Sequence, residues 1–249
     1  MVPMLYYTFN ALGYPAAVTM HMAVATSAAV IIVTSPRSAL GHHKKDAVDW
    51  SLVWPRPVLG KLFQNWGLWI GFGALMGSWV MAKFLSGEQL TLLFGLVAAV
   101  LALQFIMGRP DWGLASDVPG PPAAPLAGTV LGALCALMGI GFGSIGVTLM
   151  LLFGKTIHRA IGTAAAIGFF IGFPAAIGYI ISGWGLEGLP PWSLGYVNLL
   201  GFGLMAVMTY ICVPFGVKLA HDLNQARLRK FFGICLLLVA FNMVRKVVF

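Results

Sequence analysis

Charged residues are scarce in this sequence: Lys, Arg, Asp and Glu make up 9% of its 249 positions, whereas hydrophobic residues make up 59%. A soluble domain of this length needs a charged surface, which so few charges cannot cover. The mean hydropathy of +0.90 also lies far above the range of soluble domains. The composition therefore excludes a water-soluble protein and predicts an integral membrane protein.

Residues suited to catalysis or metal binding are scarce as well. The seven acidic residues lie in loops or at the ends of apolar segments, so no carboxylate is placed inside the membrane for acid–base work or proton relay. Cys135, Cys212 and Cys235 have no partners at metal or redox spacing. His42 and His43, beside two lysines, indicate a basic loop. The sequence predicts no enzyme, no cofactor and no metal site.

The net charge of +8 raises the question of nucleic acid binding. The basic residues, however, lie in short clusters between apolar runs rather than along one polar face. This distribution is typical of residues that set membrane topology beside anionic lipid headgroups. We expect lipid contacts and no nucleic acid partner.

Apolar segments of about 20 residues, the length of one helical crossing, recur along the chain. They lack the period-2 alternation of porin strands. The predicted fold class is therefore an all-α, multi-pass membrane protein. The segments lie at 22–41, 66–84, 89–108, 126–153, 160–182, 193–217 and 231–248, after a shorter one at 2–13.

A ten-residue phrase occurs twice: "HMAVATSAAV" begins at His21 and "HRAIGTAAAI" begins at His158, at an offset of 137. The shorter strings "WSL", "GFG" and "FG" also recur in the same order. Four ordered matches indicate internal duplication. We predict a first membrane repeat at 1–108, a linker rich in Pro and Gly at 109–125, and a second repeat at 126–249.

The positions of basic residues indicate how the two repeats are oriented. The loop after the first phrase carries five Lys and Arg between residues 37 and 61, whereas its counterpart at 183–191 carries none. In two further pairs of matched loops, one loop again carries more Lys and Arg than its counterpart. This alternation favours inverted repeats. Arg245 and Lys246 disagree, because inversion puts them near the outer face.

The segment 126–153 is too long for one simple crossing. Inversion puts both of its ends on the inner side, and its 28 residues would form a straight helix of about 42 Å, against a core of about 30 Å. Its middle, "GIGFGSIG" at 139–146, contains four glycines. We predict a broken helix or a re-entrant hairpin; one tilted helix is the alternative.

Such a break exposes backbone N–H groups, and helix N-termini attract anions. Three of the glycines have GxGxxG spacing, but they lie in an apolar run without a βαβ unit, so nucleotide binding is not predicted. Close helix packing through glycine is the structural alternative. The candidate anion-binding residues of this segment are Gly139, Gly141, Gly143, Ser144 and Gly146.

Hydroxyl and basic side chains complete the candidate site. Thr26, Ser27 and Thr163 lie near the starts of two spans, and the two threonines occupy matched positions in the repeated phrase. Their hydroxyls are suited to an oxyanion, although hydroxyls in membrane helices also bond to their own backbone. His158 and Arg159 lie at the mouth of the second span, where contacts with lipid headgroups are the alternative.

The phrase at 21–30, the basic loop ending in Asp49 and Trp50, and the glycine-rich segment before the second phrase resemble the sulfite exporter TauE/SafE family. The resemblance covers nearly the whole chain. It implies a duplicated transporter of the bacterial inner membrane that exports sulfite, sulfoacetate or related organosulfonates and binds a small oxyanion between its repeats. The rival functions are an anion channel and a scaffolding protein without transport; the oligomeric state, monomer or homo-oligomer, stays open.

Two departures from the family pattern bear on the site. The glycine-rich arm that usually precedes "VPML" does not appear, so we expect either a start codon upstream of Met1 or a first half-site that is incomplete. In the second copy, Phe142 and Ser144 stand within "GIGFGSIG" where the family has a triple glycine. We expect these two side chains to reshape the pocket.

Overall fold

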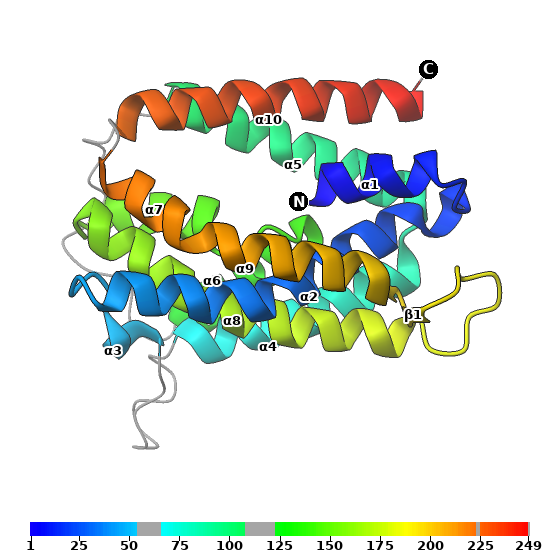
Figure 1. The fold of residues 1–249 in the computed structure, drawn as a ribbon, viewed down its shortest axis with the longest axis horizontal. Helices are drawn as coiled ribbons and strands as arrows, with labels where there is room; N and C mark the ends of the chain where they lie inside the picture. Colours follow the sequence, from blue (N-terminus) through cyan, green and yellow to red (C-terminus); the bar gives the residue numbers. More distant parts are fainter. Residues whose placement is uncertain (54–65, 108–122, 223–224, 249) are drawn as a thin grey trace.

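The structure is a computed structural model that describes residues 1–53, 66–107, 123–222 and 225–248. Long helices lie side by side in one bundle, and a two-stranded hairpin is present at one end (Figure 1). The all-α fold class is confirmed. The elements are α1 (Val2–Ala11), α2 (Ala16–His43), α3 (Trp50–Val53), α4 (Trp66–Phe84), α5 (Gly87–Met107), α6 (Ala123–Met138), α7 (Gly143–Leu152), α8 (Ile157–Ser182), β1 (Ser193–Leu194), β2 (Val197–Asn198), α9 (Leu199–Asp222) and α10 (Gln225–Val248).

Four helices of the described chain are long and apolar enough to cross a membrane: α2, α5, α8 and the part of α9 up to Leu219. The apolar segments predicted from the sequence coincide closely with the helices. The segment 66–84 is α4 to the residue, and 126–153 is divided between α6 and α7. The linker predicted at 109–125 lies largely outside the described residues.

Two predicted boundaries are wrong. Helix α2 begins at Ala16, because Pro15 sets the entry to the helix and the polar Thr19 and His21 are buried in the bundle rather than outside it. The segment predicted to enter a helix at 193 instead forms the β1–β2 hairpin, which pairs Ser193 with Asn198. Trp192 and Gly195 there have positive φ, which a helix does not allow. The "WSL" strings are therefore not equivalent, since the first starts α3 and the second leads into β1.

Helix α2 forms the centre of the bundle. It contacts α1, α5, α8 and α9, and 72% of its most apolar window is buried. The apolar window of α9, by contrast, is only 6% buried, and large side chains such as Leu204 and Phe215 are exposed on it. Exposed apolar surface of this extent suits a helix that faces lipid.

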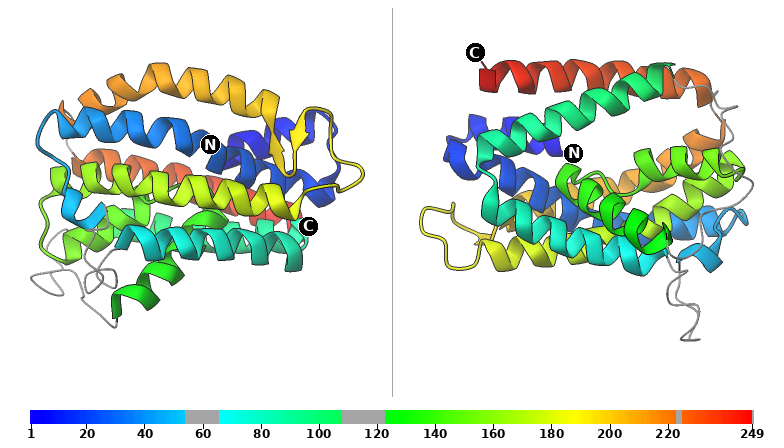
Figure 2. Two further views of the ribbon diagram at one scale, coloured as in Figure 1. Left: turned by 90° about the horizontal axis from the view of Figure 1, so that it is seen from below. Right: turned by 180° about the vertical axis from the view of Figure 1, so that it is seen from behind.

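Helices α2 and α8 run antiparallel and touch through small residues (Figures 1 and 2). The Ser35 hydroxyl donates to the Ala165 carbonyl at 2.8 Å. A side chain at Gly172 would lie 2.9 Å from the Ala28 carbonyl oxygen, so the two backbones meet there. At the offset of 137, Ala28 corresponds to Ala165 and Ser35 to Gly172. The contact of Ser35 with Ala165 and the contact of Ala28 with Gly172 therefore involve the same two repeat positions, with the two helices exchanged.

Helices α5 and α10 show the same exchange along one edge of the bundle (Figure 2). Gly95 of α5 faces Val244 and the Ala240 carbonyl, while Gly233 of α10 faces Ile106 and the Ala102 carbonyl. At an offset of 138 these two sets of three residues correspond one to one. Two copies related by a two-fold axis are expected to exchange contacts in this way.

Candidate functional site

The glycine-rich segment contains the predicted helix break. Helix α6 ends at Met138 and α7 begins at Gly143, so the prediction of a broken helix is confirmed. Gly139 has φ +54° and Gly141 has φ +71°, a region that other residues rarely adopt. The buried Gly139 also packs so closely that a side chain there would lie 2.9 Å from Val2 Cγ2 and 3.1 Å from the Val24 carbonyl oxygen.

The break lies against the start of another short helix. Helices α1 and α7 have ten residues each, and each is followed by a glycine with positive φ, Gly13 and Gly154. Figure 1 shows α1 starting near the middle of the bundle and running toward the hairpin end, while α7 lies toward the end that holds α3. The first N–H groups of a helix lack partners within it, so each start offers backbone donors. The start of α1 lies inside the bundle, where Val2 is buried, whereas Gly143 at the start of α7 is exposed.

Ser27 joins this segment to α2. Its hydroxyl, which is fully buried, donates a hydrogen bond of 2.7 Å to the Gly139 carbonyl oxygen. Of the predicted site residues, the structure thus brings Ser27 and Gly139 into contact, with Gly141 next to Ile31 one turn further along α2. This bond directs the carbonyl dipole of the break toward α2, so the carbonyl oxygen is occupied by a donor.

The first turn of α7 contains the remaining predicted glycines. Gly143 is exposed, and a side chain there would meet nothing within 4 Å. Gly146 is buried beneath the ring of Phe142, which is itself 1% exposed. Ser144 belongs to the same turn, but its side chain lies outside the described residues. The ring of Phe142 therefore covers Gly146 in the first turn of α7, and the reshaping of an anion pocket by Phe142 and Ser144 stays a prediction.

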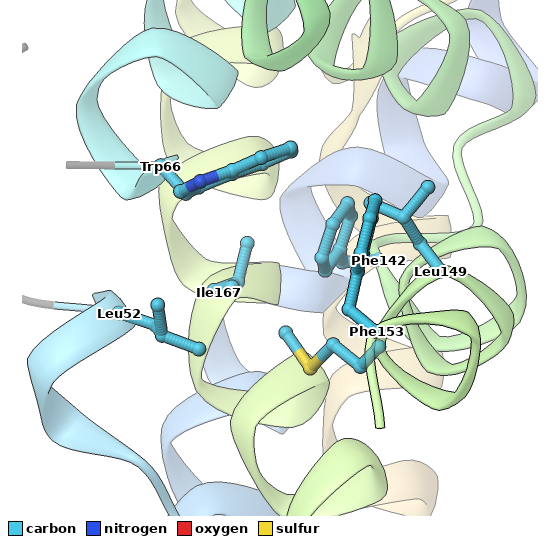
Figure 3. Close-up of a pocket in the computed structure, with 7 residues that line it drawn as sticks. Leu52, Trp66, Phe142, Leu149, Phe153 and Ile167 are labelled. Atoms are coloured by element: carbon cyan, nitrogen blue, oxygen red, sulfur yellow. The ribbon is translucent and has the colours of Figure 1, made fainter. Parts of the chain in front are cut away.

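A small apolar pocket lies beside the break (Figure 3). Side chains from α3, α4, α7 and α8 converge on it, and Phe142 forms part of its wall. Its lining is aliphatic and aromatic and presents no polar surface to an anion, so it is not the candidate anion site. The lining residues are Leu52, Trp66, Phe142, Leu149, Met150, Phe153 and Ile167.

The two matched threonines each hold a loop of the other half of the chain. The fully buried Thr26 on α2 accepts a 3.0 Å hydrogen bond from the Asn198 amide. Thr163 on α8, 1% exposed, accepts a 2.9 Å hydrogen bond from the Asp49 amide. Figure 1 places the hairpin at β1, whose second strand contains Asn198, and α3, which follows Asp49, at opposite ends of the bundle, so the structure does not bring the threonines to one point. Their role in anion binding stays a prediction.

Sequence reasoning missed the two partners of these threonines. The Asp49 carboxylate accepts hydrogen bonds from the Ser51 amide at 3.2 Å and the Ser51 hydroxyl at 2.5 Å, and Asn198 Oδ1 accepts from the Gly201 amide at 2.7 Å. Both residues thus cap the start of the next helix. The available signal was the recurrence of Val followed by Asp or Asn after each long span, at 48–49 and 197–198.

The basic residues near the second phrase lie at a mouth of the bundle. His158 and Arg159 are exposed in the first turn of α8. Lys155 Nζ lies 4.0 Å from Asp49 Oδ2, and both side chains are partly exposed. An exposed pair of this kind contributes little to stability. The net positive charge at this mouth is suited to attracting an anion from solution.

Within the described chain, no group of three or more His, Cys, Asp and Glu residues could hold a metal ion. The described cysteines are free, with Cys135 buried and Cys212 and Cys235 exposed. The candidate groups for an anion are therefore the backbone N–H groups beside the break, the hydroxyls of Thr26, Ser27 and Thr163, and the exposed His158 and Arg159. Of these, Ser27 contacts the break directly.

Comparison with known proteins identifies the family. The profile of the family "Sulfite exporter TauE/SafE" matches residues 1–243. This chain belongs to the sulfite exporter TauE/SafE family. It is also 28% identical over 247 residues to a "Probable membrane transporter protein" of Haemophilus influenzae, covering 99% of this chain and 89% of the relative. No solved structure matches the chain.

Family membership and the apolar helices agree on the general function. The TauE/SafE chain is a multi-pass membrane protein of a transporter family, whose usual location is the bacterial inner membrane. The resemblance noted from the repeated phrase and the glycine-rich segment is thus confirmed. Neither comparison names a substrate that has been established for a close relative.

Proposed function

We propose that this TauE/SafE chain exports small sulfur-containing oxyanions, namely sulfite, sulfoacetate or related organosulfonates, and that it is not an enzyme. The observation that carries the proposal is the buried glycine break between α6 and α7, packed against the start of α1. The family description supports the substrate class, and the name of the Haemophilus relative supports transport.

In this proposal the anion binds where the break between α6 and α7 lies against the start of α1. Backbone N–H groups at helix starts donate hydrogen bonds to oxyanions, and the helix dipoles favour negative charge there. A carbonyl oxygen facing the same space would repel the anion. Ser27 prevents this repulsion because its hydroxyl donates to the Gly139 carbonyl at 2.7 Å.

The threonines act at the two ends of the path. In the conformation described here, Thr26 and Thr163 hold the Asn198 and Asp49 loops through their hydroxyl oxygens. When one half moves against the other, a released loop would free the hydroxyl for the anion. His158 and Arg159 raise the local concentration of anions at one mouth.

The movement follows from the proposed arrangement of the chain as two inverted repeats, 1–108 and 126–249. The exchanged contacts of α2 with α8 and of α5 with α10 support this arrangement. Since α2 and α8 run antiparallel, a two-fold axis relating them lies across the helices, in the plane of the membrane. Inverted repeats of this kind expose a central site to one side and then to the other by rocking.

Flux measurements on proteoliposomes test the proposed substrate. Purified protein is reconstituted, and entry of radiolabelled sulfite is followed with and without excess unlabelled sulfite, sulfoacetate or chloride. We expect saturable uptake that sulfite and sulfoacetate suppress and chloride does not. Protein-free liposomes and liposomes with heat-denatured protein are the controls.

The same experiment separates the rival functions. Uptake that never saturates would favour an anion channel, and uptake of no tested anion would favour a scaffolding protein. Either result would overturn the proposal. Conversion of sulfite or sulfoacetate into another compound, monitored by mass spectrometry of the external solution, would overturn the proposal that the chain is not an enzyme.

A further inference from the structure

His21 is a buried titratable residue to which the anion site described above gives no role. It lies on α2, and its side chain is 3% exposed. The ring Nε2 lies 3.1 Å from the Leu85 carbonyl oxygen at the turn between α4 and α5. Because a carbonyl only accepts, Nε2 bears the hydrogen, and the other nitrogen, Nδ1, is left as an acceptor in the neutral ring.

The Nδ1 atom of His21 is buried and has no hydrogen-bond partner. A buried lone pair without a donor is unfavourable. Protonation of Nδ1 would replace this lone pair by a second N–H group that can donate to a neighbouring acceptor.

Tyr179 of α8 carries a second polar atom without a partner. Its side chain is fully buried, and its hydroxyl makes no hydrogen bond. The α2–α8 interface pairs Ala28 with Gly172. His21 lies two turns before Ala28 on α2, and Tyr179 lies two turns after Gly172 on α8. Since the helices are antiparallel, the two residues lie on the same faces and at the same level. Two polar atoms without partners thus belong to the interface in which Ala28, Ile31 and Gly172 pack together.

The hairpin closes the cluster from the other side. The Tyr196 ring stacks on the His21 ring with centroids 5.0 Å apart, and Tyr196 N donates to the Tyr179 carbonyl at 3.5 Å. Asn198, which follows on β2, is 1% exposed, and its Nδ2 is a third buried polar atom without a partner. Polar groups left unpaired in one conformation cost stability and are characteristic of sites that bind something in another.

We propose that His21 is a proton-binding site that couples proton movement to anion transport, with the Tyr179 hydroxyl accepting a hydrogen bond from the protonated ring. The proposal rests on the proposed function of the chain as an anion transporter. Burial opposes the charged ring in the conformation described here. A conformation that opens the hairpin end toward water would favour the charged ring of His21. Proton binding and the conformational change are therefore linked.

No charged group of the described residues competes for this role at His21. On the α4–α5 side, Lys83 lies over the Trp79 and Phe84 rings and Glu88 is exposed. Of the titratable side chains, that of Tyr196 from the hairpin stacks on His21, and Tyr179 occupies the same level of α8. Burial raises the pKa of Tyr196, so its hydroxyl stays neutral over the pH range in which histidine titrates.

Coupling can be measured as anion accumulation driven by a pH gradient. The probe is radiolabelled sulfoacetate, which does not change its protonation between pH 6 and 8, in proteoliposomes whose membrane potential is clamped with valinomycin and potassium. One proton coupled to one anion gives up to about tenfold accumulation for each pH unit. We expect the parent protein to accumulate sulfoacetate under a pH gradient of one sign and to exchange it without a gradient.

The decisive variant is His21→Gln, because a glutamine amide can still donate to the Leu85 carbonyl but cannot take up a proton. We expect it to keep sulfoacetate exchange and to lose accumulation, with an inside-to-outside ratio of about one. The exposed His43, replaced in His43→Gln, is the matched control and should behave like the parent. Accumulation by His21→Gln equal to that of the parent would overturn the proposal.

The Tyr179→Phe variant tests the proposal independently of His21→Gln, including the case in which the latter does not fold. It removes a buried hydroxyl that has no partner, so the fold should tolerate it. We expect the midpoint of the pH dependence of accumulation to move about one unit lower, because the protonated ring loses an acceptor. An unchanged midpoint would overturn the role of Tyr179. If the parent exchanges sulfoacetate but does not accumulate it under a pH gradient, the proton site alone is overturned. If the parent exchanges neither sulfoacetate nor sulfite, the proposed function is overturned as well.

Discussion

The helix break at Gly139 offers the sharpest prediction about the site, because two separate terms oppose a side chain there. Gly139→Ala adds one methyl group to a residue with φ +54°. This left-handed conformation costs about 1–2 kcal/mol for a residue with a Cβ atom. The new Cβ would also lie 2.9 Å from Val2 Cγ2 and 3.3 Å from Ser27 Cβ. Overpacking of this kind costs about 1–3 kcal/mol.

The two terms add to a loss of about 2–5 kcal/mol in the free energy of unfolding. In a chain of this size, each kcal/mol lowers the melting temperature by about 2–4 °C. We therefore expect Gly139→Ala to melt several degrees below the parent in detergent. Sulfite binding, measured at temperatures where both proteins are folded, should also weaken, because the Gly139 carbonyl cannot keep its place next to Ser27.

The matched control is Gly203→Ala on α9. A side chain at this position meets no atom within 4 Å, and the residue lies away from the break. It should melt with the parent and bind sulfite equally well. If Gly139→Ala melted together with Gly203→Ala, the break would not be the tightly constrained element described here, and the argument for a preorganised site would fail.

Three further results are expected. Thr26→Val and Thr163→Val each remove the acceptor of a loop amide and should lower the free energy of unfolding by about 1–3 kcal/mol. If the hydroxyl also serves the anion, each variant should bind sulfite about tenfold or more weakly. Normal binding with lowered stability would assign the threonines a purely structural role. Ser27→Ala, which leaves the Gly139 carbonyl without its donor, should raise the Kd for sulfite about tenfold with a smaller effect on melting, and an unchanged Kd would contradict the role given to Ser27. Cysteines introduced as Lys44→Cys and Glu187→Cys, in a background without native cysteines, should label from opposite sides of the membrane, and labelling from one side would reject inverted repeats.

The sequence predicted the helices well, because most of them are apolar runs of about the length of one crossing. The break between α6 and α7 was predictable because the segment 126–153 is too long for one crossing and its four glycines at 139–146 are close together, whereas the four glycines inside α8 are spread along the helix. The hairpin at 193–198 was missed because Leu194, Tyr196 and Val197 were counted with the apolar run of α9 that follows. The turn depends on the positive φ of Trp192 and Gly195, and hydropathy does not report backbone angles.

The candidate site was predictable only in part. Ser27 and Gly139 come together because the break packs on α2, and the repeated phrase drew attention to this part of α2. The partners of the threonines could not be predicted, since contacts between Thr26 and Asn198 or between Thr163 and Asp49 depend on how the two halves pack. The matched positions of the threonines suggested one shared site, but antiparallel helices separate equivalent residues toward opposite ends.

Counterflow of sulfite tests the central claim, carrier-type transport of a sulfur oxyanion, most directly. Proteoliposomes are loaded with unlabelled sulfite, diluted into labelled sulfite at low concentration, and sampled over time. A carrier that alternates between its two sides should take up label faster and to a higher transient level in loaded than in unloaded vesicles. Uptake that is equal in loaded and unloaded vesicles, or no greater than in protein-free vesicles, would contradict the claim.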